Sequence, residues 1–212
     1  DIALEHAEGM ATKKVLTTPD KPEEGVLSGI RSTLTEANIS PSEINILIHG
    51  TTLATNALIE RKGAKVALIT TEGLRDSVEM AQENRFEQYD INIDRPKPLV
   101  PRYLRWGIRE RMNVNGEVLI QLEDKSIEQL LPMIDKNQIE AIAIGLIHSY
   151  ANSMHEEKIA ERLSAARPDL SITLSSQVCP EIREYERQST ACANAYVPVS
   201  YTHLRAHETI AN

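Results

Sequence analysis

Aromatic residues are scarce in this 212-residue sequence, at 4% of the chain. Trp106 and Phe86 are its only tryptophan and its only phenylalanine. Hydrophobic residues still make up 41%, which is ordinary for a soluble globular protein. The length suits one large domain or two small ones. We therefore expect a core built from Ile, Leu, Val and Ala side chains.

The sequence also lacks the features of several protein classes. Its net charge is −8 and it has no Lys/Arg cluster, so nucleic acid is not an expected partner. The longest apolar runs, such as Ile142–Ile147, are too short to span a bilayer, and no charged-then-apolar leader opens the chain. The two cysteines, Cys179 and Cys192, fit a reducing compartment as small buried side chains. We therefore expect a cytoplasmic protein without a membrane partner.

Several catalytic signatures are missing as well. The sequence contains no G-x-x-x-x-G-K-[S/T] phosphate loop, no G-x-G-x-x-G dinucleotide fingerprint and no G-x-S-x-G elbow. A hydrolase of the serine-triad kind is therefore not expected.

Both ends of the chain are unusual. It opens at Asp1 without a methionine, and residues 199–209 read VSYTHLRAHET. That string resembles the translation of a transposase-derived sequencing adapter, so we predict that residues 199–212 are a non-native tail. The alternative is a genuine C-terminal tail. His203 and His207 stand four apart, as a helical metal pair would, but we discount them for this reason and predict no metal ligand.

Hydrophobic periodicity and turn residues predict alternating strands and helices. The expected strands are 2–6, 12–17, 44–48, 66–70, 103–112, 118–122, 141–147 and 170–174. The expected helices are 52–61, 74–81, 126–136, 153–166, 186–196 and one that begins at 22. Gly63 is expected to cap the second helix in chain order, Ser126 to begin the fourth, and residues 113–117 to form a hairpin turn.

This alternation predicts an α/β fold with a mixed, largely parallel sheet. We expect one region spanning 1–198. Residues 72–122 are predicted to be an irregular lobe whose strands need not join the main sheet, because Pro96, Pro98 and Pro101 break the chain there.

Polar residues gather where the predicted strands end. Ligands of open parallel sheets bind at the carboxyl ends of the strands. Each predicted exit carries hydroxyl side chains, and two carry a histidine. These exits are His49-Gly50-Thr51-Thr52, Thr70-Thr71, His148-Ser149-Tyr150 and Ser175-Ser176. If the strands are parallel, these groups line one edge of the sheet.

The run at residues 49–52 has the strongest physical case. Gly50 lets the backbone approach a ligand or turn sharply. Thr51 or Thr52 can cap the following helix, whose exposed amides suit phosphate or carboxylate. His49 can polarise a bond or transfer a proton near neutral pH. The alternative, which the pattern leaves open, is that Thr52 is merely a cap and that His49 bonds a neighbouring loop.

Two further groups have weaker cases. His148 can simply be the polar end of a strand, and its spacing of seven from His155 is not a zinc pattern. Arg187 can lie against an anionic ligand, or it can belong to a solvated helix start with local charge pairs.

Residues 49–64, HGTTLATNALIERKGA, resemble the hallmark of the hydantoinase A/5-oxoprolinase N-terminal region, which also occurs in acetone carboxylase β subunits. The resemblance continues in order through TTEGLRD at 70–76, IRER at 108–111, LIHSYAN at 146–152, PEIREYER at 180–187 and NAYV at 194–197. It covers nearly all of residues 1–198.

The resemblance implies an actin-like ATPase fold with ribonuclease-H-like halves, in which ATP hydrolysis with Mg²⁺ drives the opening of a cyclic amide such as hydantoin or 5-oxoproline. An amide is a poor electrophile, and phosphorylating its oxygen creates a leaving group. The implied catalytic residues are His49, Thr51, Thr52, Asn56 and Arg187. Asp1 and Gly50 are the implied cofactor-binding residues.

The sequence departs from the family at both ends. Members begin with a phosphate-binding hairpin resembling D-x-G-G-T-x-T-D, of which only the last Asp is present, as Asp1. We therefore expect a fragment of an ATP-dependent cyclic-amide hydrolase that is inactive alone. Its expected partners are the missing C-terminal region of the same enzyme and a hydantoinase B-type subunit. The alternatives are a β-subunit fragment of an acetone carboxylase-type enzyme and a non-catalytic α/β binding module.

Overall fold

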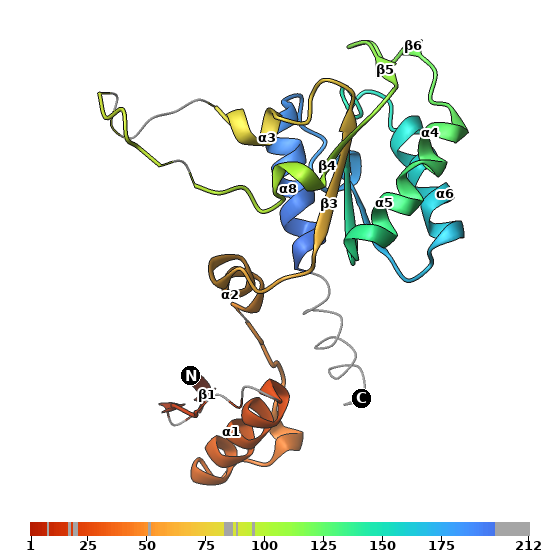
Figure 1. The fold of residues 1–212 in the computed structure, drawn as a ribbon. Coiled ribbons are helices and arrows are strands. Elements are labelled where there is room, and N and C mark those ends of the chain that lie inside the picture. Colours follow the sequence, from red (N-terminus) through yellow and green to blue (C-terminus); the bar gives the residue numbers. More distant parts are fainter. Residues whose placement is uncertain are drawn as a thin grey trace. The chain divides into compact units, whose positions relative to one another are not determined.

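The computed structural model describes residues 1–197, apart from residues 8, 17, 19–20, 51, 83–86, 88 and 95. Thr51, Phe86 and the predicted non-native tail at 199–212 therefore lie outside the described residues. The chain divides into two compact units (Figure 1). Among the described residues, unit 1 contains residues 1–52 and unit 2 contains residues 53–197.

Unit 1 is an antiparallel hairpin and a helix. Strands β1 (Ile2–His6) and β2 (Gly9–Lys13) pair in register, which confirms the predicted hairpin although its second strand begins earlier. Helix α1 (Pro22–Glu36) packs closely on the hairpin. The contact at Gly29 leaves no room for a side chain, since an added Cβ would lie 2.4 Å from Ile2 Cδ1. A 3₁₀ turn, η1 (Pro41–Glu43), follows.

The predicted strand at 44–48 is wrong. Residues 44–50 belong to no helix or strand. Ile46, Leu47 and Ile48 are 78%, 66% and 90% exposed. A strand needs a neighbouring strand to bond its backbone, and the described part of unit 1 pairs only β1 with β2. The apolar pattern at 44–48 is therefore not realised as a sheet strand in this structure.

Unit 2 is built around a four-stranded sheet in the order β4-β3-β7-β8 (Figure 1). All three pairs of neighbours run parallel, which confirms the predicted α/β class. The central strands β3 and β7 are buried along their whole lengths. The bounds are Val66–Thr71 for β3, Arg105–Ile108 for β4, Ala141–Gly145 for β7 and Ser171–Leu174 for β8.

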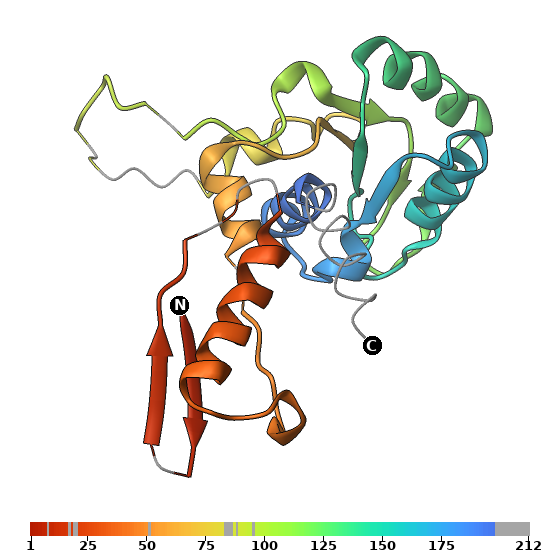
Figure 2. The same cartoon turned by 90° about the horizontal axis from the view of Figure 1, so that it is seen from below.

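Helices cover both faces of this sheet. Helix α8 lies against one face, and α5 and α6 pack on the other (Figures 1 and 2). The core is aliphatic as predicted, with Trp106 as a buried aromatic side chain. No helix among the described residues is long and apolar enough to cross a membrane. The helices are α2 (Leu53–Glu60), α3 (Ser77–Met80), α4 (Asp124–Glu128), α5 (Leu130–Asn137), α6 (Met154–Ala166), α7 (Ser175–Val178) and α8 (Glu184–Tyr196).

Residues 103–112, predicted as one strand, form two. After the short 3₁₀ turn η2 (Arg102–Leu104), β4 joins the main sheet beside β3. Strand β5 (Arg111–Met112) instead pairs antiparallel with β6 (Val118–Ile120). The hairpin turn predicted at 113–117 is confirmed. Its backbone is tied by Asn113 Oδ1, which accepts from Asn115 N and Glu117 N at 2.9 Å each.

Two predicted helix caps are wrong. Ser126 lies inside α4, because that helix begins at Asp124 with Glu123 at its N-cap; the predicted helix 126–136 is divided between α4 and α5. Gly63 does not cap α2, because Arg61 takes the left-handed conformation at φ 57°. Gly63 instead lies against Tyr196, where an added Cβ would come within 2.3 Å of the ring.

Candidate functional site

The run predicted as the reaction site lies on both sides of the boundary between the units. His49, Gly50 and Thr52 are exposed in unit 1, and Asn56 is exposed on α2 in unit 2. Thr51 lies outside the described residues. A Cβ added at Gly50 would meet nothing within 4 Å, so the space beside this backbone is open to a ligand. The convergence of these residues on one ligand stays a prediction.

Asp1, the predicted cofactor-binding residue, lines a shallow pocket on the β1–β2 hairpin. The pocket has a volume of about 330 Å³. Lys13 turns from its wall toward α1, where its Nζ donates to Ser32 Oγ at 2.6 Å and pairs with Glu36. The lining therefore includes a carboxylate, a hydroxyl and two lysines, and the ammonium of Lys13 bonds α1. The lining residues are Asp1, Ile2, Ala3, Thr12, Lys13 and Lys14.

In unit 2 the predicted strand exits converge on one edge of the sheet. Thr71 Oγ1, at the end of β3, accepts from Ile147 N beyond β7 at 2.9 Å. Ser149 Oγ lies 3.3 Å from Ser175 Oγ, which follows β8. The exits of β3, β7 and β8 thus form a shared carboxyl edge, as the parallel topology predicts.

Glu156, in the first turn of α6, is a buried carboxylate that joins two of these exits. Its Oε1 accepts from Leu146 N at 3.0 Å and from Ser175 Oγ at 2.6 Å. Its Oε2 accepts from Ser176 N at 3.0 Å and from Ser176 Oγ at 2.7 Å. Four donors thus compensate the burial of this charge and tie α6 to the ends of β7 and β8.

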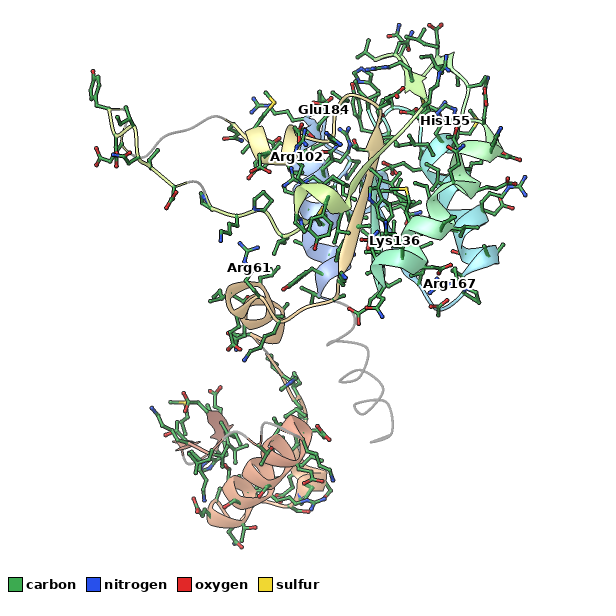
Figure 3. The ribbon with its side chains drawn as sticks, viewed as in Figure 1. Arg61, Arg102, Lys136, His155, Arg167 and Glu184 are labelled. Carbon is green, nitrogen blue, oxygen red and sulfur yellow. The ribbon has the colours of Figure 1, made fainter. Side chains whose placement is uncertain are left out.

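A second buried carboxylate, Glu110, follows β4. Thr71 Oγ1 donates to its Oε1, and His155 Nδ1 lies 2.8 Å from its Oε2. Nε2 of His155 is buried and bonds none of the described residues. Figure 3 shows His155 at the upper end of α6, near the β5–β6 hairpin. This network joins the exits of β3 and β4 to α6.

Arg187, predicted to support the cleft, is completely buried. Its guanidinium donates to Leu146 O at 2.9 Å and to Ile182 O at 3.0 Å, and lies 5.5 Å from the centre of the Tyr150 ring. Burial lowers the pKa of Arg187 below its ordinary value, because desolvation disfavours the charged form. The interpretation as part of a solvated helix start is therefore wrong, while contact with an anionic ligand stays a prediction.

Sequence reasoning missed Glu110, Glu156 and the buried Gln188 as members of this edge. One signal was available for two residues of the network. His155 and Glu156 precede the buried Ile159 and Leu163 at helical spacing, so they continue the apolar face of α6. Two polar residues, His155 and Glu156, at the start of an apolar helix face predict that their side chains are buried and form hydrogen bonds there. No comparable local signal marks Gln188.

A larger cleft, of about 720 Å³, lies at the opposite edge of the sheet. Its residues Lys65 and Glu140 directly precede β3 and β7, so it opens at the amino ends of the strands. Arg167, which also lines it, lies at the lower end of α6 (Figure 3). Parallel sheets bind ligands at the other edge, so we assign the candidate site to the carboxyl edge. Within the described ranges, no group of three His, Cys, Asp or Glu residues is arranged to hold a metal ion.

The parallel sheet of unit 2 and the hairpin-and-helix unit before it define the class of protein. The fold is that of the N-terminal region of an actin-like ATPase. Residues 1–166 match the hydantoinase/oxoprolinase N-terminal region, and the chain belongs to this family.

Similar proteins include the caprolactamase subunit alpha of Pseudomonas jessenii, 32% identical over 90% of this chain and 29% of that protein. The acetophenone carboxylase gamma subunit of Aromatoleum aromaticum is 29% identical over 87% of this chain and 28% of its own length. The crystal structure of the ATP-dependent caprolactamase from Pseudomonas jessenii superposes with a TM-score of 0.85. That match has 31% identity and covers 98% of this chain and 31% of the caprolactamase chain. The chain thus spans less than a third of these relatives.

Proposed function

We propose that this chain is the N-terminal part of an ATP-dependent hydrolase that opens cyclic amides such as hydantoin or 5-oxoproline. The observation that carries the proposal is the likeness to the ATP-dependent caprolactamase, which extends over 98% of this chain at a TM-score of 0.85. Caprolactam is itself a cyclic amide. The activity belongs to the longer protein of which this chain would form under a third, and the chain alone has no turnover.

The carbonyl carbon of a lactam is a poor electrophile. Transfer of the terminal phosphoryl group of ATP to the lactam oxygen, with release of ADP, would make that carbon easier for water to attack. The C–N bond would then break with the amine as leaving group, and hydrolysis of the acyl phosphate would release inorganic phosphate. The segment from Gly50 to the start of α2 suits a phosphate group of the nucleotide. The backbone at Gly50 is open to a phosphate, and the amides at the start of α2 follow within three residues. Asp1 offers a carboxylate, the ligand type that Mg²⁺ prefers. Mg²⁺ would offset the charge of the phosphates.

The polar side chains around Gly50 suit the amide itself. His49 can donate to the amide oxygen or move a proton, and the hydroxyls of Thr51 and Thr52 can orient the ring. Asn56, on α2, can bond both the carbonyl and the N–H of an amide. Within unit 2, Arg187 would support the carboxyl edge of the sheet, because it holds the backbone at Leu146 and lies against Tyr150.

The test is a chimera in which residues 1–197 replace the matching region of the Pseudomonas jessenii caprolactamase subunit alpha, assembled with the rest of that enzyme. Release of ADP is measured with caprolactam, 5-oxoproline and hydantoin in turn. We expect at least one of the three to stimulate ATP hydrolysis. His49→Ala should lower that stimulated rate by about 10²-fold or more, the range typical of a lost acid–base group. His6→Ala, on the hairpin, is the matched control. Absence of stimulation by all three amides contradicts the proposal.

The likeness to the acetophenone carboxylase gamma subunit supports a second candidate, a subunit of an ATP-dependent carboxylase. The same chimera separates the two functions, because a carboxylase hydrolyses ATP in response to a ketone and bicarbonate. Either function implies the remaining region of the enzyme and a further subunit, such as a hydantoinase B-type protein, as partners. A non-catalytic binding module would bind no nucleotide in the assembled chimera.

A further inference from the structure

Four buried side chains hold the backbone where β7 ends. From α8, Gln188 Nε2 donates to Gly145 O and Arg187 Nη2 donates to Leu146 O, each at 2.9 Å. From the other side, Leu146 N donates to Glu156 Oε1 at 3.0 Å and Ile147 N donates to Thr71 Oγ1 at 2.9 Å. We call Thr71, Glu156, Arg187 and Gln188 the β7 clamp. Two consecutive amides and two consecutive carbonyls are thus fixed by side chains from three different elements.

The residue presented by the β7 clamp is His148. It is half-buried at the carboxyl edge, and its φ of 54° lies in the left-handed region that a side chain with a Cβ disfavours. Its ring stands edge-on to Tyr150, with ring centres 5.9 Å apart. Strained backbone of this kind persists only where the surroundings over-determine it, and it clusters at functional sites. The β7 clamp fixes the backbone just before His148, and the His148 carbonyl accepts from Ala151 N at 2.9 Å in the turn that follows.

Glu110 affects the backbone before His148 indirectly, through its hydrogen bond with Thr71. The Thr71 hydroxyl has a single proton, which it donates to Glu110, so its lone pairs are oriented toward Ile147 N. Glu110 is itself fixed by His155, 2.8 Å away, and is only 2% exposed. It therefore has no route to a ligand at the edge. A series of hydrogen bonds runs from His155 through Glu110 and Thr71 to the amide that precedes His148.

We propose that Glu110 is a positioning residue that holds His148 in its left-handed conformation, ready to contact a ligand at the carboxyl edge. The identity of that ligand rests on the proposed function. It is the cyclic amide, which Nε2 of His148 can bond, while Nδ1 lies 3.5 Å from the Tyr150 hydroxyl. The positioning role rests on the geometry alone.

The positioning role is tested on this chain by hydrogen exchange of assigned backbone amides. Thr71→Val removes the bonded hydroxyl at nearly constant shape, and Thr71→Ser keeps it. We expect Thr71→Val and Glu110→Gln to accelerate exchange at Ile147 about ten-fold or more, while Thr71→Ser restores the original rate. Leu146 is the internal control, because its amide is bonded by Glu156. Its exchange should respond to Glu156→Gln and not to Thr71→Val.

Two outcomes overturn the positioning role. One is unchanged exchange at Ile147 in Thr71→Val or in Glu110→Gln. The other is equal acceleration at Leu146 and Ile147, which would indicate general loosening. If Glu110→Gln fails to fold, the comparison of Thr71→Val with Thr71→Ser still decides the matter.

The ligand contact is tested in the caprolactamase chimera. Thr71→Val and His148→Ala should each lower kcat/KM for the amide about ten-fold, and Thr71→Ser should restore it. Glu117→Gln is the matched control, because this exposed carboxylate accepts from Asn113 within the β5–β6 hairpin turn. An active chimera indifferent to both substitutions overturns the ligand contact. A chimera with no amide-stimulated hydrolysis refutes the proposed function instead, and the exchange experiment then still decides the role of Glu110.

Discussion

Units 1 and 2 differ in whether their apolar runs are buried or exposed. Unit 2 buries two whole strands, β3 and β7, between helices on both faces. Among the described residues of unit 1, Thr33 and Leu34 are buried, while Ile46, Leu47 and Ile48 are exposed. A hairpin of two strands is at best marginally stable in water without further packing. The comparison shows that an apolar run becomes a strand only where neighbouring strands and helices are present to cover it.

The largest expected difference between the two units is in the accessibility of one thiol in each of them. Burial raises the pKa of Cys192 to about 12 in unit 2, so at pH 7.5 fewer than one in about 10⁴ of its thiols are ionised. Ile48→Cys places a thiol where the native side chain is 90% exposed. In a Cys179→Ala background, we expect a disulfide reagent to label the new thiol at least about 10³ times faster than Cys192. Equal labelling rates in the folded protein would show that the two environments are alike.

The second way is to make the same substitution in each unit. Ile144→Ala in β7 should lower the free energy of unfolding by about 2–5 kcal/mol, because Ile144 is completely buried and its removal leaves a cavity. Ile48→Ala should change it by less than about 0.5 kcal/mol. Urea unfolding followed by Trp106 fluorescence, with circular dichroism for unit 1, measures both. A cost for Ile48→Ala close to that of Ile144→Ala contradicts the comparison.

The elements that could be predicted from sequence are those whose evidence is local. The run 141–147 and the run 44–48 are similarly apolar, yet only the first forms a strand. The difference is the presence of β3 and β8 on either side of β7, which periodicity does not report. For the same reason β4 could not be assigned to the main sheet from its own residues. It lies beside β3 only after the intervening chain has folded back.

The residues of the candidate site also differ in whether local sequence could predict them. Hydroxyls at strand exits were predictable because parallel topology brings carboxyl ends together, and Thr71, Ser149 and Ser175 confirm it. The buried partners were not predictable. Thr71 and Glu110 are 39 residues apart, and Thr70 and Gln188 are 118 residues apart. Only the packing of helices on the sheet determines which distant polar groups meet.

A third prediction compares one carboxylate in each unit. Glu156→Gln replaces an acceptor of four hydrogen bonds with an amide whose NH₂ faces donors, so we expect a loss of about 1–3 kcal/mol. Glu43→Gln is the matched change in unit 1. There the carboxylate is exposed and accepts from Ser40 N at 2.7 Å in a capping box, so about 0.5 kcal/mol or less is expected. Thermal unfolding of both variants measures the difference, and a smaller loss for Glu156→Gln than for Glu43→Gln would refute it.

The smallest expected effect concerns an ion pair on the surface of unit 2. Arg102 donates to both oxygens of Asp76 at 2.9 Å, and this hydrogen bonding lowers the pKa of Asp76 below its ordinary value. The pair therefore stabilises the fold above the pKa of the unfolded chain, and that contribution is lost as the pH falls through the lower folded pKa.

Because both side chains are largely exposed, solvent screens the interaction and the change is small. Arg102→Ala should bring the NMR-measured pKa of Asp76 back toward its ordinary value and slightly reduce the pH dependence of unfolding below about pH 4. Arg31→Ala, an exposed change in unit 1, should leave both quantities unaltered. An unshifted pKa of Asp76 in Arg102→Ala would mean that the bidentate pair does not persist in solution. Exposed pairs would then contribute nothing to the difference in stability between the two units.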